Sequence, residues 1–461
     1  MSRKTSDENP PESVPEYEDR LAAADAAIKR GLAAGATEVE FFIRARHVHE
    51  LSLDGDLIDV RDLSESGAGV RLRKDGRIGT ASAQDLTRLD ALVDEALSNT
   101  RSGRAVPEGV AQSFPAPARL SSAPATTRPP PNFELSRLED ILAAAHDVFA
   151  SIPSISYHEM SARWVERDMT IVNNHGLSVR DRQPSHKVAF QVRASRGTTH
   201  RTASDSWVAD APPPAAAGRD IIAGAVQRAL DALAVETESM THERIVMAPG
   251  PASQVVGMIA PNLAAKPRGA AATRLSDRLG ESVMSASVSL HNDATASHAL
   301  LRRHFDDEGM RARAVPLIEH GVLRQLTYDH ATAAQHGVGA TGTSTRDGLS
   351  GAISSVPRAL TMAAGDHALD ELLEALDDGV FVTEPMLGSF TANATTGAFS
   401  LSLPFAFRVR GGRIVHALPP TTVGGNAYDV LTKVEAIGRD KQAYAPAYMP
   451  ALLVGGVTCA S

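Results

Sequence analysis

The amino-acid sequence predicts an α+β fold, in which a few helices are segregated from a largely antiparallel sheet. Strand-like segments are joined by two-residue turns such as Asp75-Gly76 and His320-Gly321, which are typical of antiparallel hairpins. Apolar residues at helical spacing form separate blocks, most of them in the first half of the chain. We therefore expect an N-terminal helix–hairpin–helix α/β region followed by a mostly antiparallel β C-terminal domain.

The first helix–hairpins–helix unit follows a polar lead. Pro15 suits the first turn of a helix, and apolar residues recur at helical spacing from there to Gly35, which ends the helix. A strand over 39–44 comes next, and hairpins turn on Asp54-Gly55 and on Asp75-Gly76. A second amphipathic helix over 86–97 closes the unit.

The same order then recurs. A helix is expected over 135–149, a hairpin over 169–180 around Asn174-His175-Gly176, a further strand over 188–194 and a helix over 220–235. Two units of the same order suggest a pseudo-repeat, although the two segments share no evident residue-level identity.

Strand patterns dominate from residue 243 onward. Residues 314–329 alternate around His320-Gly321, residues 405–416 alternate around Gly411-Gly412, and a single helix over 368–376 interrupts them. The predicted division of the chain is a disordered lead over 1–15, an N-terminal α+β domain over 16–104, a Pro-rich linker over 105–132, a central α+β region over 133–242 and a C-terminal β-rich domain over 243–461.

Chain length, net charge and cysteine content limit the classes of protein to which the chain could belong. A chain of 461 residues exceeds what one hydrophobic core usually serves. A net charge of -9 disfavours non-specific binding to nucleic acid, and the basic run 71–74 is interpreted as solvated surface. Cys459 is the only cysteine, so no intrachain disulfide can form. The sequence shows neither a secretory signal nor a membrane span, so we expect a soluble, cytoplasmic protein.

Several histidines could be interpreted as metal ligands. A zincin helix needs a second histidine one turn after a His-Glu pair. The pairs beginning at His158 and His242 lack it, because positions 162 and 246 are Ala and Val. His47 and His49 share one face of a strand, but no third donor follows at a readable spacing, so we expect a surface pair.

The densest polar cluster is His304-Phe305-Asp306-Asp307-Glu308-Gly309. Its consecutive carboxylates lack the alternate-position ligands of a Ca²⁺ loop, so a turn that enters the strand at 314 is the simpler interpretation. The segment 337–342 has the glycine spacing of a dinucleotide-binding loop, but it follows a helix-like run rather than a strand, which argues against that function.

The window 246–280 contains no histidine or cysteine, and Asp277 is its only carboxylate. A zinc site requires three or four such donors converging on one point. This window therefore cannot supply a zinc site.

Motifs along the chain resemble the TldD/PmbA family, once called modulators of DNA gyrase. The family's C-terminal signature is similar to Phe305–Gly309, Pro316–Arg324 and Ala340–Gly342 of this chain. The family's closing hairpins are similar to residues 397–407, 412–416, 424–426 and 437–438. Its opening domain is similar to 34–39, to an expected turn over Gly67–Val70, and to 79–85.

The resemblance implies one of two subfamilies. One carries zinc on a helix with a His-Glu pair and a second His, plus a later Cys. The other, called PmbA or TldE, lacks these ligands and pairs with the first. Here the zinc-helix position corresponds to residues 254–265, which offer no donor, and Pro261 would end or kink a helix there. Cys459 lies beyond the late-cysteine motif.

The resemblance therefore implies a non-catalytic TldE/PmbA-like subunit with no cofactor of its own. Zinc is expected in a TldD-like metallopeptidase partner, and the heterodimer would cleave unfolded or modified peptides, in protein degradation or peptide maturation. No catalytic residue or metal ligand is carried over to this chain. The candidates for a substrate cavity or an interface are Phe305, Asp306, Glu308, Gly309, Thr341, Gly342, Gly425 and Asn426.

Two other functions stay open at the level of sequence. The chain could be a stand-alone hydrolase that uses the cluster from His304 to Glu308, or a peptide-binding module without any role in peptidase activity. Direct contact with DNA, which the old family label suggests, is disfavoured by the acidic balance.

Overall fold

The computed structural model describes most of the chain. The described residues are 3–4, 17–55, 57–106, 110–117, 135–210, 214–237, 240–266, 270–271, 273–296, 299, 302–404, 406–444 and 447–460. Helices make up 24% and strands 43% of the structure, which confirms the predicted α+β class.

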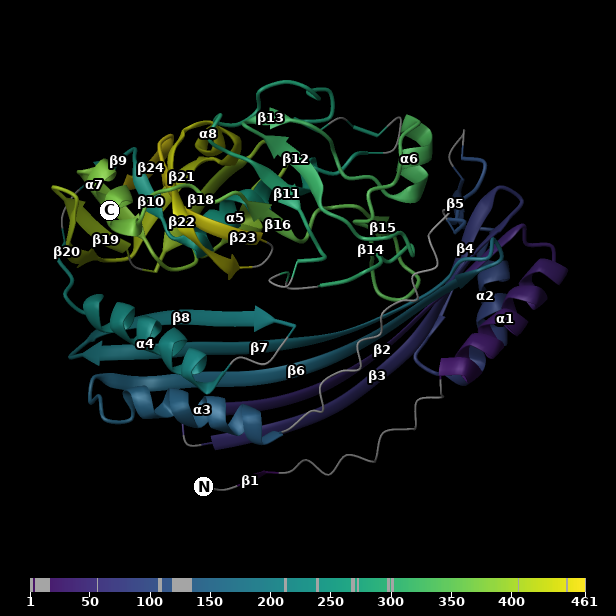
Figure 1. The fold of residues 1–461 in the computed structure, drawn as a ribbon, viewed down its shortest axis with the longest axis horizontal. Coiled ribbons are helices and arrows are strands. Elements are labelled where there is room, and N and C mark those ends of the chain that lie inside the picture. Colours follow the sequence, from purple (N-terminus) through teal and green to yellow (C-terminus); the bar gives the residue numbers. More distant parts are fainter. Residues whose placement is uncertain are drawn as a thin grey trace.

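A long, curved, antiparallel sheet occupies the first half of the chain (Figure 1). Its strand order is β5-β4-β3-β2-β6-β7-β8, and the two-residue strand β1 (Arg3–Lys4) pairs with β3 in parallel. The strands are β2 (Glu38–Asp54), β3 (Leu57–Lys74), β4 (Arg77–Ala83), β5 (Arg104–Ala105), β6 (Ile155–Asn173), β7 (Ser178–Arg196) and β8 (Thr199–Ala209).

The helices repeat in the expected order. The sequence of elements α1-β2-β3-β4-α2 is followed by α3-β6-β7-β8-α4, and the pairing of β2 with β6 joins the two units into one sheet. The predicted domain division remains a prediction, but the sheet is shared by the N-terminal and central regions. The helices are α1 (Tyr17–Ala33), the short 3-10 helix η1 (Leu86–Arg88), α2 (Leu89–Asn99), α3 (Leu135–Phe149) and α4 (Ala215–Asp231).

Alternation along β2 assigns the two faces of the sheet. Phe41 and Ile43 are buried in a cluster with residues of α1 and α2, whereas Leu51 and Leu53 are buried in another with residues of α3 and α4. The odd-numbered residues of β2 therefore point to the helix-bearing face. Phe42, one residue out of phase, packs beside Phe305 and Leu349, so the opposite face meets the C-terminal part.

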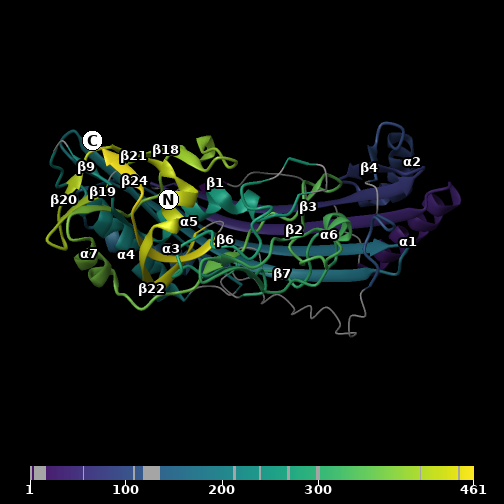
Figure 2. The same ribbon diagram turned by 90° about the horizontal axis from the view of Figure 1, so that it is seen from above.

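The C-terminal part lies over that opposite face, and the long strands extend beneath it (Figures 1 and 2). Its main sheet has the order β13-β12-β11-β16-β23-β10-β17-β19-β20, with β22 beside β23. A smaller sheet has the order β18-β21-β24-β9, and β14 pairs with β15. The strands are β9 (Thr241–His242), β10 (Ile245–Met247), β11 (Leu290–Asn292), β12 (Val315–Glu319), β13 (Val322–Leu323), β14 (Thr345–Arg346), β15 (Ile353–Ser354), β16 (Leu360–Met362), β17 (Gly379–Val382), β18 (Ala398–Leu403), β19 (Ala406–Arg410), β20 (Arg413–Leu418), β21 (Thr421–Asn426), β22 (Val434–Tyr444), β23 (Ala447–Val454) and β24 (Val457–Ala460).

The C-terminal part contains more helices than the single one that the sequence predicts. The predicted helix is α7 (Leu369–Leu376), and the structure adds α5, α6 and α8. Periodicity missed α5 because eight of its eleven residues are buried, so that no polar face marks it as a helix. The added helices are α5 (Pro249–Ile259), α6 (His330–His336) and α8 (Ala427–Thr432), with 3-10 turns η2 (Ala260–Asn262) and η3 (Ser389–Thr391).

The predicted turns at Asp75-Gly76 and His320-Gly321 are present, whereas Asp54 is the last residue of β2 and pairs with Leu57 instead of lying within the turn. Asp75 and Gly76 have φ of 51° and 71°, and His320 and Gly321 have φ of 48° and 77°, so both central residues take positive φ as a type I′ turn requires. The expectation of a turn over Gly67–Val70 is wrong, because these residues lie inside β3.

Two predictions fall largely outside the described residues. Of the expected lead over 1–15, only β1 is described, and of the expected linker over 105–132, only residues 105–106 and 110–117 are described. Among the helices of the described part, none is long and apolar enough to cross a membrane.

Candidate functional site

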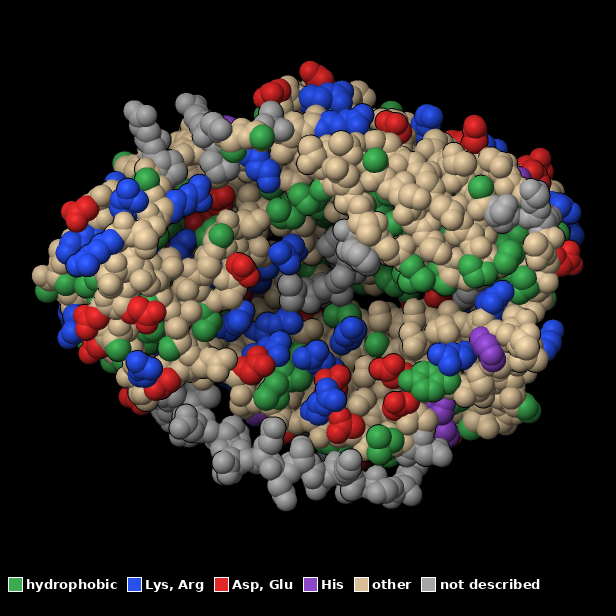
Figure 3. Space-filling model, turned by 180° about the vertical axis from the view of Figure 1, so that it is seen from behind, with side chains coloured by type: hydrophobic (Ala, Val, Ile, Leu, Met, Phe, Trp, Pro, Cys, Tyr) green, Lys and Arg blue, Asp and Glu red, His purple; other side chains and the backbone are tan. Residues whose placement is uncertain are grey.

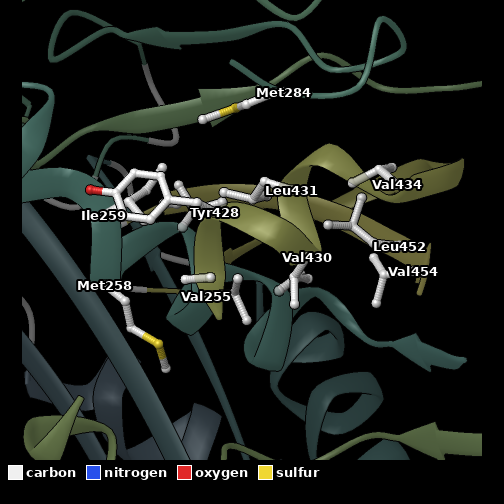
Figure 4. Close-up of a cluster of buried hydrophobic side chains, with 14 of the residues drawn as sticks. Val255, Met258, Ile259, Met284, Tyr428, Val430, Leu431, Val434, Leu452 and Val454 are labelled. Carbon is white, nitrogen blue, oxygen red and sulfur yellow. The ribbon is translucent and has the colours of Figure 1, made fainter. Parts of the chain in front are cut away.

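Helix α5 occupies the position that the resemblance assigns to a zinc helix. Val255, Met258 and Ile259 belong to a hydrophobic cluster that also contains Tyr428 and Leu431, although the side chain of Met258 points away from those two residues (Figure 4). Proline at N1 begins the helix, and it ends at Ile259, just before the 3-10 turn that contains Pro261, as the sequence predicts.

The polar side chains of α5 bind backbone rather than a metal. Ser253 Oγ donates to the carbonyl of Tyr444 at 2.5 Å. Gln254 Nε2 donates to the carbonyl of Met386 at 2.9 Å, and Gln254 Oε1 accepts from the Met386 amide at 2.6 Å. A zinc ion needs His, Cys or carboxylate donors, so α5 does not fit a zinc ion.

The cluster 304–309 forms a buried turn against the sheet. Asp306 is fully buried, and its carboxylate accepts from the backbone amides of Glu308 at 3.0 Å, Met310 at 2.9 Å and Ser344 at 2.9 Å. Glu308 Oε2 accepts from the amide of His330 at 2.8 Å and from Ser344 Oγ at 2.8 Å. These carboxylates therefore fix the backbone of segments that are distant in sequence.

Burial shifts the ionisation of both carboxyl groups. Burial and the nearby Glu308 raise the pKa of Asp306 to about 7. Burial also raises the pKa of Glu308, against the opposing effect of Arg71. Two neighbouring carboxyl groups of this kind hold a proton more strongly than exposed ones.

The first residue of the cluster, His304, is anchored on β7. Asp181 Oδ2 accepts from the His304 amide at 2.6 Å, and Asp181 Oδ1 lies 3.0 Å from His304 Nδ1. Burial alone would raise the pKa of Asp181, but hydrogen bonds from His304 and Gln183 lower it. Phe305 packs beside Phe42, and Gly309 has φ of 77° with Leu177 where a Cβ would lie.

A buried ion cluster ties the sheet to the strand β14. Glu40 Oε1 accepts from Arg71 Nη2 at 2.7 Å and from Arg346 Nη2 at 2.8 Å, and Arg346 also donates to the carbonyl of Asp307 at 2.9 Å. Burial would raise the pKa of Glu40, but Arg71 and Arg346 hold it below its ordinary value. The interpretation of the basic run 71–74 as solvated is therefore wrong for Arg71, which is buried because its carboxylate partner comes from β2.

The remaining candidates fall into two places. Thr341 Oγ1 donates to the carbonyl of Tyr328 at 3.0 Å, and Gly342 lies against Arg311, whose carbonyl oxygen would be 2.1 Å from an added Cβ. Gly425 and Asn426 belong instead to β21 in the smaller sheet, where Asn426 accepts from the Tyr428 amide and caps α8. The structure thus brings residues 305–309 near Ser344 but places 425–426 in a different sheet.

A cavity of about 610 Å³ lies where the N-terminal sheet and the C-terminal part meet. Arg71, Phe114, Glu308, Asp329 and Ile353 are among the residues that line it. Of the predicted candidates, Glu308 is therefore the one that borders this space, with one carboxylate oxygen bonded to the backbone of α6.

The structure gives different outcomes for the two His-Glu pairs and for the pair His47 and His49. His158 lies in β6 and His242 in β9, so neither begins a metal-binding helix. His47 and His49, however, gain the third donor that the sequence did not reveal. Asp62 lies opposite His49 on β3, and the three ligand atoms lie within 4.8 Å of one another. Strand pairing, which is not local in sequence, supplies this donor.

Three family models together cover most of the chain. They describe the PmbA/TldA metallopeptidase domain 1 at residues 39–100, the central domain at 128–233 and the C-terminal domain at 240–461. The fold and these matches define the class of protein: the chain belongs to the PmbA/TldD metallopeptidase family.

Individual relatives agree with that assignment. A metalloprotease of Methanothermobacter thermautotrophicus is 23% identical over 407 residues, 85% of each chain. A metalloprotease of Methanocaldococcus jannaschii is 29% identical over 164 residues, and a metalloprotease TldD homologue of Buchnera aphidicola is 28% identical over 164 residues. These two alignments span 36% and 33% of the relatives' own lengths.

Two solved structures share the fold. A modulator of DNA gyrase from Thermotoga maritima is 23% identical with a TM-score of 0.80, covering 96% of this chain and 100% of that one. TldE from Thermococcus kodakarensis is 19% identical with a TM-score of 0.79, covering 95% of this chain and 100% of that one. At these identities the likeness concerns the fold alone.

Proposed function

We propose that this chain is the TldE/PmbA-like subunit of a two-subunit peptidase, without a catalytic zinc of its own on α5. Its partner would be a TldD-like zinc metallopeptidase, and the heterodimer would cleave unfolded or modified peptides in the cytoplasm. One observation carries the proposal. Helix α5, at the position where the family's metal-binding members hold zinc, offers only side chains that bind backbone or pack in the core.

In this role the chain shapes the substrate cavity and contributes no catalytic residue. Phe305 and Gly309 pack the C-terminal part against the sheet, and Asp306 and Glu308 fix the backbone of that part. Thr341 and Gly342 fix the loop beside them. Gly425 and Asn426 shape the smaller sheet as a surface for substrate or partner. A space enclosed between rigid walls admits an extended peptide and excludes a folded protein.

The alternative of a stand-alone hydrolase has less support. Asp306 and Glu308 are 0% and 2% exposed, and their oxygens already accept hydrogen bonds from backbone and Ser344. A general base must reach the proton that it abstracts, but Asp306 is fully buried, and the Glu308 carboxylate that borders the cavity is already held by the His330 amide and Ser344.

The test is co-expression with a zinc-bearing homologue from the same genome. We expect a stable complex, with peptide cleavage by the complex and none by this chain alone. Cleavage of an unfolded peptide by the isolated, metal-loaded chain would overturn the proposal. Failure to form a complex, with no gain in cleavage, would instead support a peptide-binding module.

A further inference from the structure

Five arginines gather on the face of the sheet that meets the C-terminal part. Arg44 and Arg46 lie on β2 in phase with Phe42, and Arg163 and Arg167 lie on β6. Arg46 is directly opposite Arg167 in the strand register, and Arg303 approaches from the C-terminal part. Figure 3 shows a hollow between the two parts, with Lys and Arg side chains gathered in and below it.

These charges are close enough to perturb one another. Burial, followed by the charges of Arg46, Arg303, Arg163 and Arg44, lowers the pKa of Arg167 to about 10. Like charges directly opposite each other on neighbouring strands destabilise a sheet. The fold alone gives no reason for such an arrangement in a chain whose net charge is -9.

Carboxylates neutralise only part of the cluster. Arg46 pairs with Glu65 at 3.0 Å and Arg303 with Asp307 at 3.3 Å, while Arg163 lies 3.9 Å from Glu50. Within the described part of the chain, Arg44 and Arg167 take part in no ion pair. Two guanidinium groups therefore remain available, and their planar forks suit carboxylates or phosphates.

We propose that this arginine cluster is a recognition site for carboxylate-rich segments of an extended peptide. The inference deepens the proposed function, because it names the class of peptide that the hollow would take. A peptide is favoured over nucleic acid for two reasons. The arginines lie on the face of the sheet that meets the C-terminal part rather than along an open basic face, and the rest of the chain repels a long polyanion.

The experiment measures binding to the full chain without its partner. Two fluorescent, unstructured peptides are compared by anisotropy, one with several glutamates and one with glutamine at the same positions. We expect the glutamate peptide to bind at least about tenfold more tightly, with an affinity that falls as salt is added. Equal affinity for the two peptides would overturn the proposal, as would preferential binding of a single-stranded oligonucleotide.

Variants separate recognition from structure. Arg44→Gln and Arg167→Gln should each weaken binding of the glutamate peptide while leaving the glutamine peptide unchanged. Because Arg167→Gln also relieves repulsion, its midpoint of thermal unfolding should stay the same or rise. Arg413→Gln, on the exposed hairpin β19–β20, is the matched control and should bind as the unaltered chain does. Unchanged discrimination in both cluster variants would refute the site.

The outcomes are distinguishable from those that test the partnership. If the glutamate peptide binds but no complex with a zinc-bearing homologue forms, the arginine site stands and the proposed function falls. If the complex forms and cleaves peptides with no preference for glutamate, only the arginine site falls.

A different observation carries a second inference, on the helix-bearing face. His47 Nε2 lies 2.8 Å from Asp62 Oδ1, and His49 Nδ1 lies 3.3 Å from Asp62 Oδ2. Ser64 Oγ lies 3.3 Å from His47 Nδ1, and the ring of Trp164 stacks on His49 at 5.2 Å between centroids. The neighbours thus orient both imidazoles toward one carboxylate, as supporting residues do around metal ligands.

From this geometry we infer a zinc-class metal site made by His47, His49 and Asp62. Two imidazoles and a carboxylate leave one position for water, which is a common donor set for Zn²⁺. Zinc at this site would tie β2 to β3 and would not involve α5, so zinc content alone does not report catalysis.

Zinc binding to the full chain is measured by competition with a chromogenic chelator. We expect one equivalent to bind, and His47→Ala and Asp62→Asn to weaken binding by at least about tenfold. His200→Ala, an exposed histidine elsewhere on the sheet, is the control and should bind normally. If the unaltered chain binds no zinc, or if all variants bind it equally, the zinc site is refuted. Neither outcome affects the proposal for the arginine site.

Discussion

At the scale of single residues, buried carboxylates fix the backbone of the C-terminal part and join that part to the sheet. Asp306 accepts three backbone amides, so it acts as a backbone anchor. Glu40 joins two arginines from different parts of the chain. A polar group removed from water is stable only when such partners satisfy it.

Stability should fall as pH rises from about 4 to about 7. The pKa of Asp306 is raised from 3.8 to about 7 in the folded protein, so the folded state binds more protons than the unfolded state across this window. The free energy of unfolding therefore decreases as Asp306 ionises. Asp306→Asn should flatten this dependence and lower stability by about 1–3 kcal/mol, because an amide cannot accept from all three donors.

Urea unfolding at several pH values checks the slope. Asp366→Asn, an exposed position, should retain the pH dependence of the unaltered chain. An Asp306→Asn protein with an unchanged slope would show that another group governs this window.

Arg346→Met should destabilise the protein by about 3–5 kcal/mol, because it removes one partner from a buried ion cluster. The side chain of Arg346 is 1% exposed, it pairs with Glu40, and its guanidinium lies 4.7 Å from the centre of the Phe42 ring. Chemical denaturation measures the loss. Arg313→Met, at an exposed site, should change stability little; similar losses in the two variants would contradict the cluster's structural role.

At the scale of elements, strand β3 contains two glycines whose role is evident only from the tertiary structure. Gly67 and Gly69 lie within the strand, where glycine weakens pairing. An added Cβ on Gly69 would lie 2.0 Å from the carbonyl oxygen of Leu349. These glycines therefore let a loop of the C-terminal part approach the sheet closely.

Gly69→Ala should destabilise the docking of that loop by about 1–3 kcal/mol, towards the upper end because the clash is with backbone. Hydrogen exchange should show faster exchange around 349–351. Gly424→Ala is the control, since its nearest contact would be an ordinary 3.7 Å. Normal protection in the Gly69→Ala protein would mean that the loop does not need this close approach.

At the scale of the whole molecule, the reactivity of the only cysteine shows whether the fold is intact. Cys459 is fully buried in β24, and burial raises the pKa of its thiol to about 12. Its thiolate fraction at neutral pH should therefore be lower by roughly 10³-fold than that of an exposed cysteine. The folded chain should react with a thiol reagent far more slowly than the urea-unfolded chain.

Absorbance of the released thiolate from an aromatic disulfide reagent follows that reaction. A chain with Cys459→Ser and Ser98→Cys, which moves the thiol to an exposed helix position, should react quickly when folded. Rapid reaction of the unaltered folded chain would mean that the C-terminal strand opens readily.

The arginine cluster is also a property of the whole molecule. Its arginines come from β2, β6 and the segment before residue 304, which are far apart in sequence. No local pattern could have singled out Arg44 or Arg167, because each is an ordinary polar residue of an alternating strand.

The sequence by itself determined the local features of this protein. The turns at Asp75-Gly76 and His320-Gly321, the end of α5 before Pro261 and the lack of histidine and cysteine over 246–280 depend on adjacent residues, whose backbone preferences and side-chain chemistry are fixed by residue type. Only the tertiary structure decided that two repeated units share one sheet, that Arg71 is buried, and that Asp62 joins His47 and His49. Strand partners and burial arise from contacts between distant segments, and a single sequence carries no direct record of which segments meet.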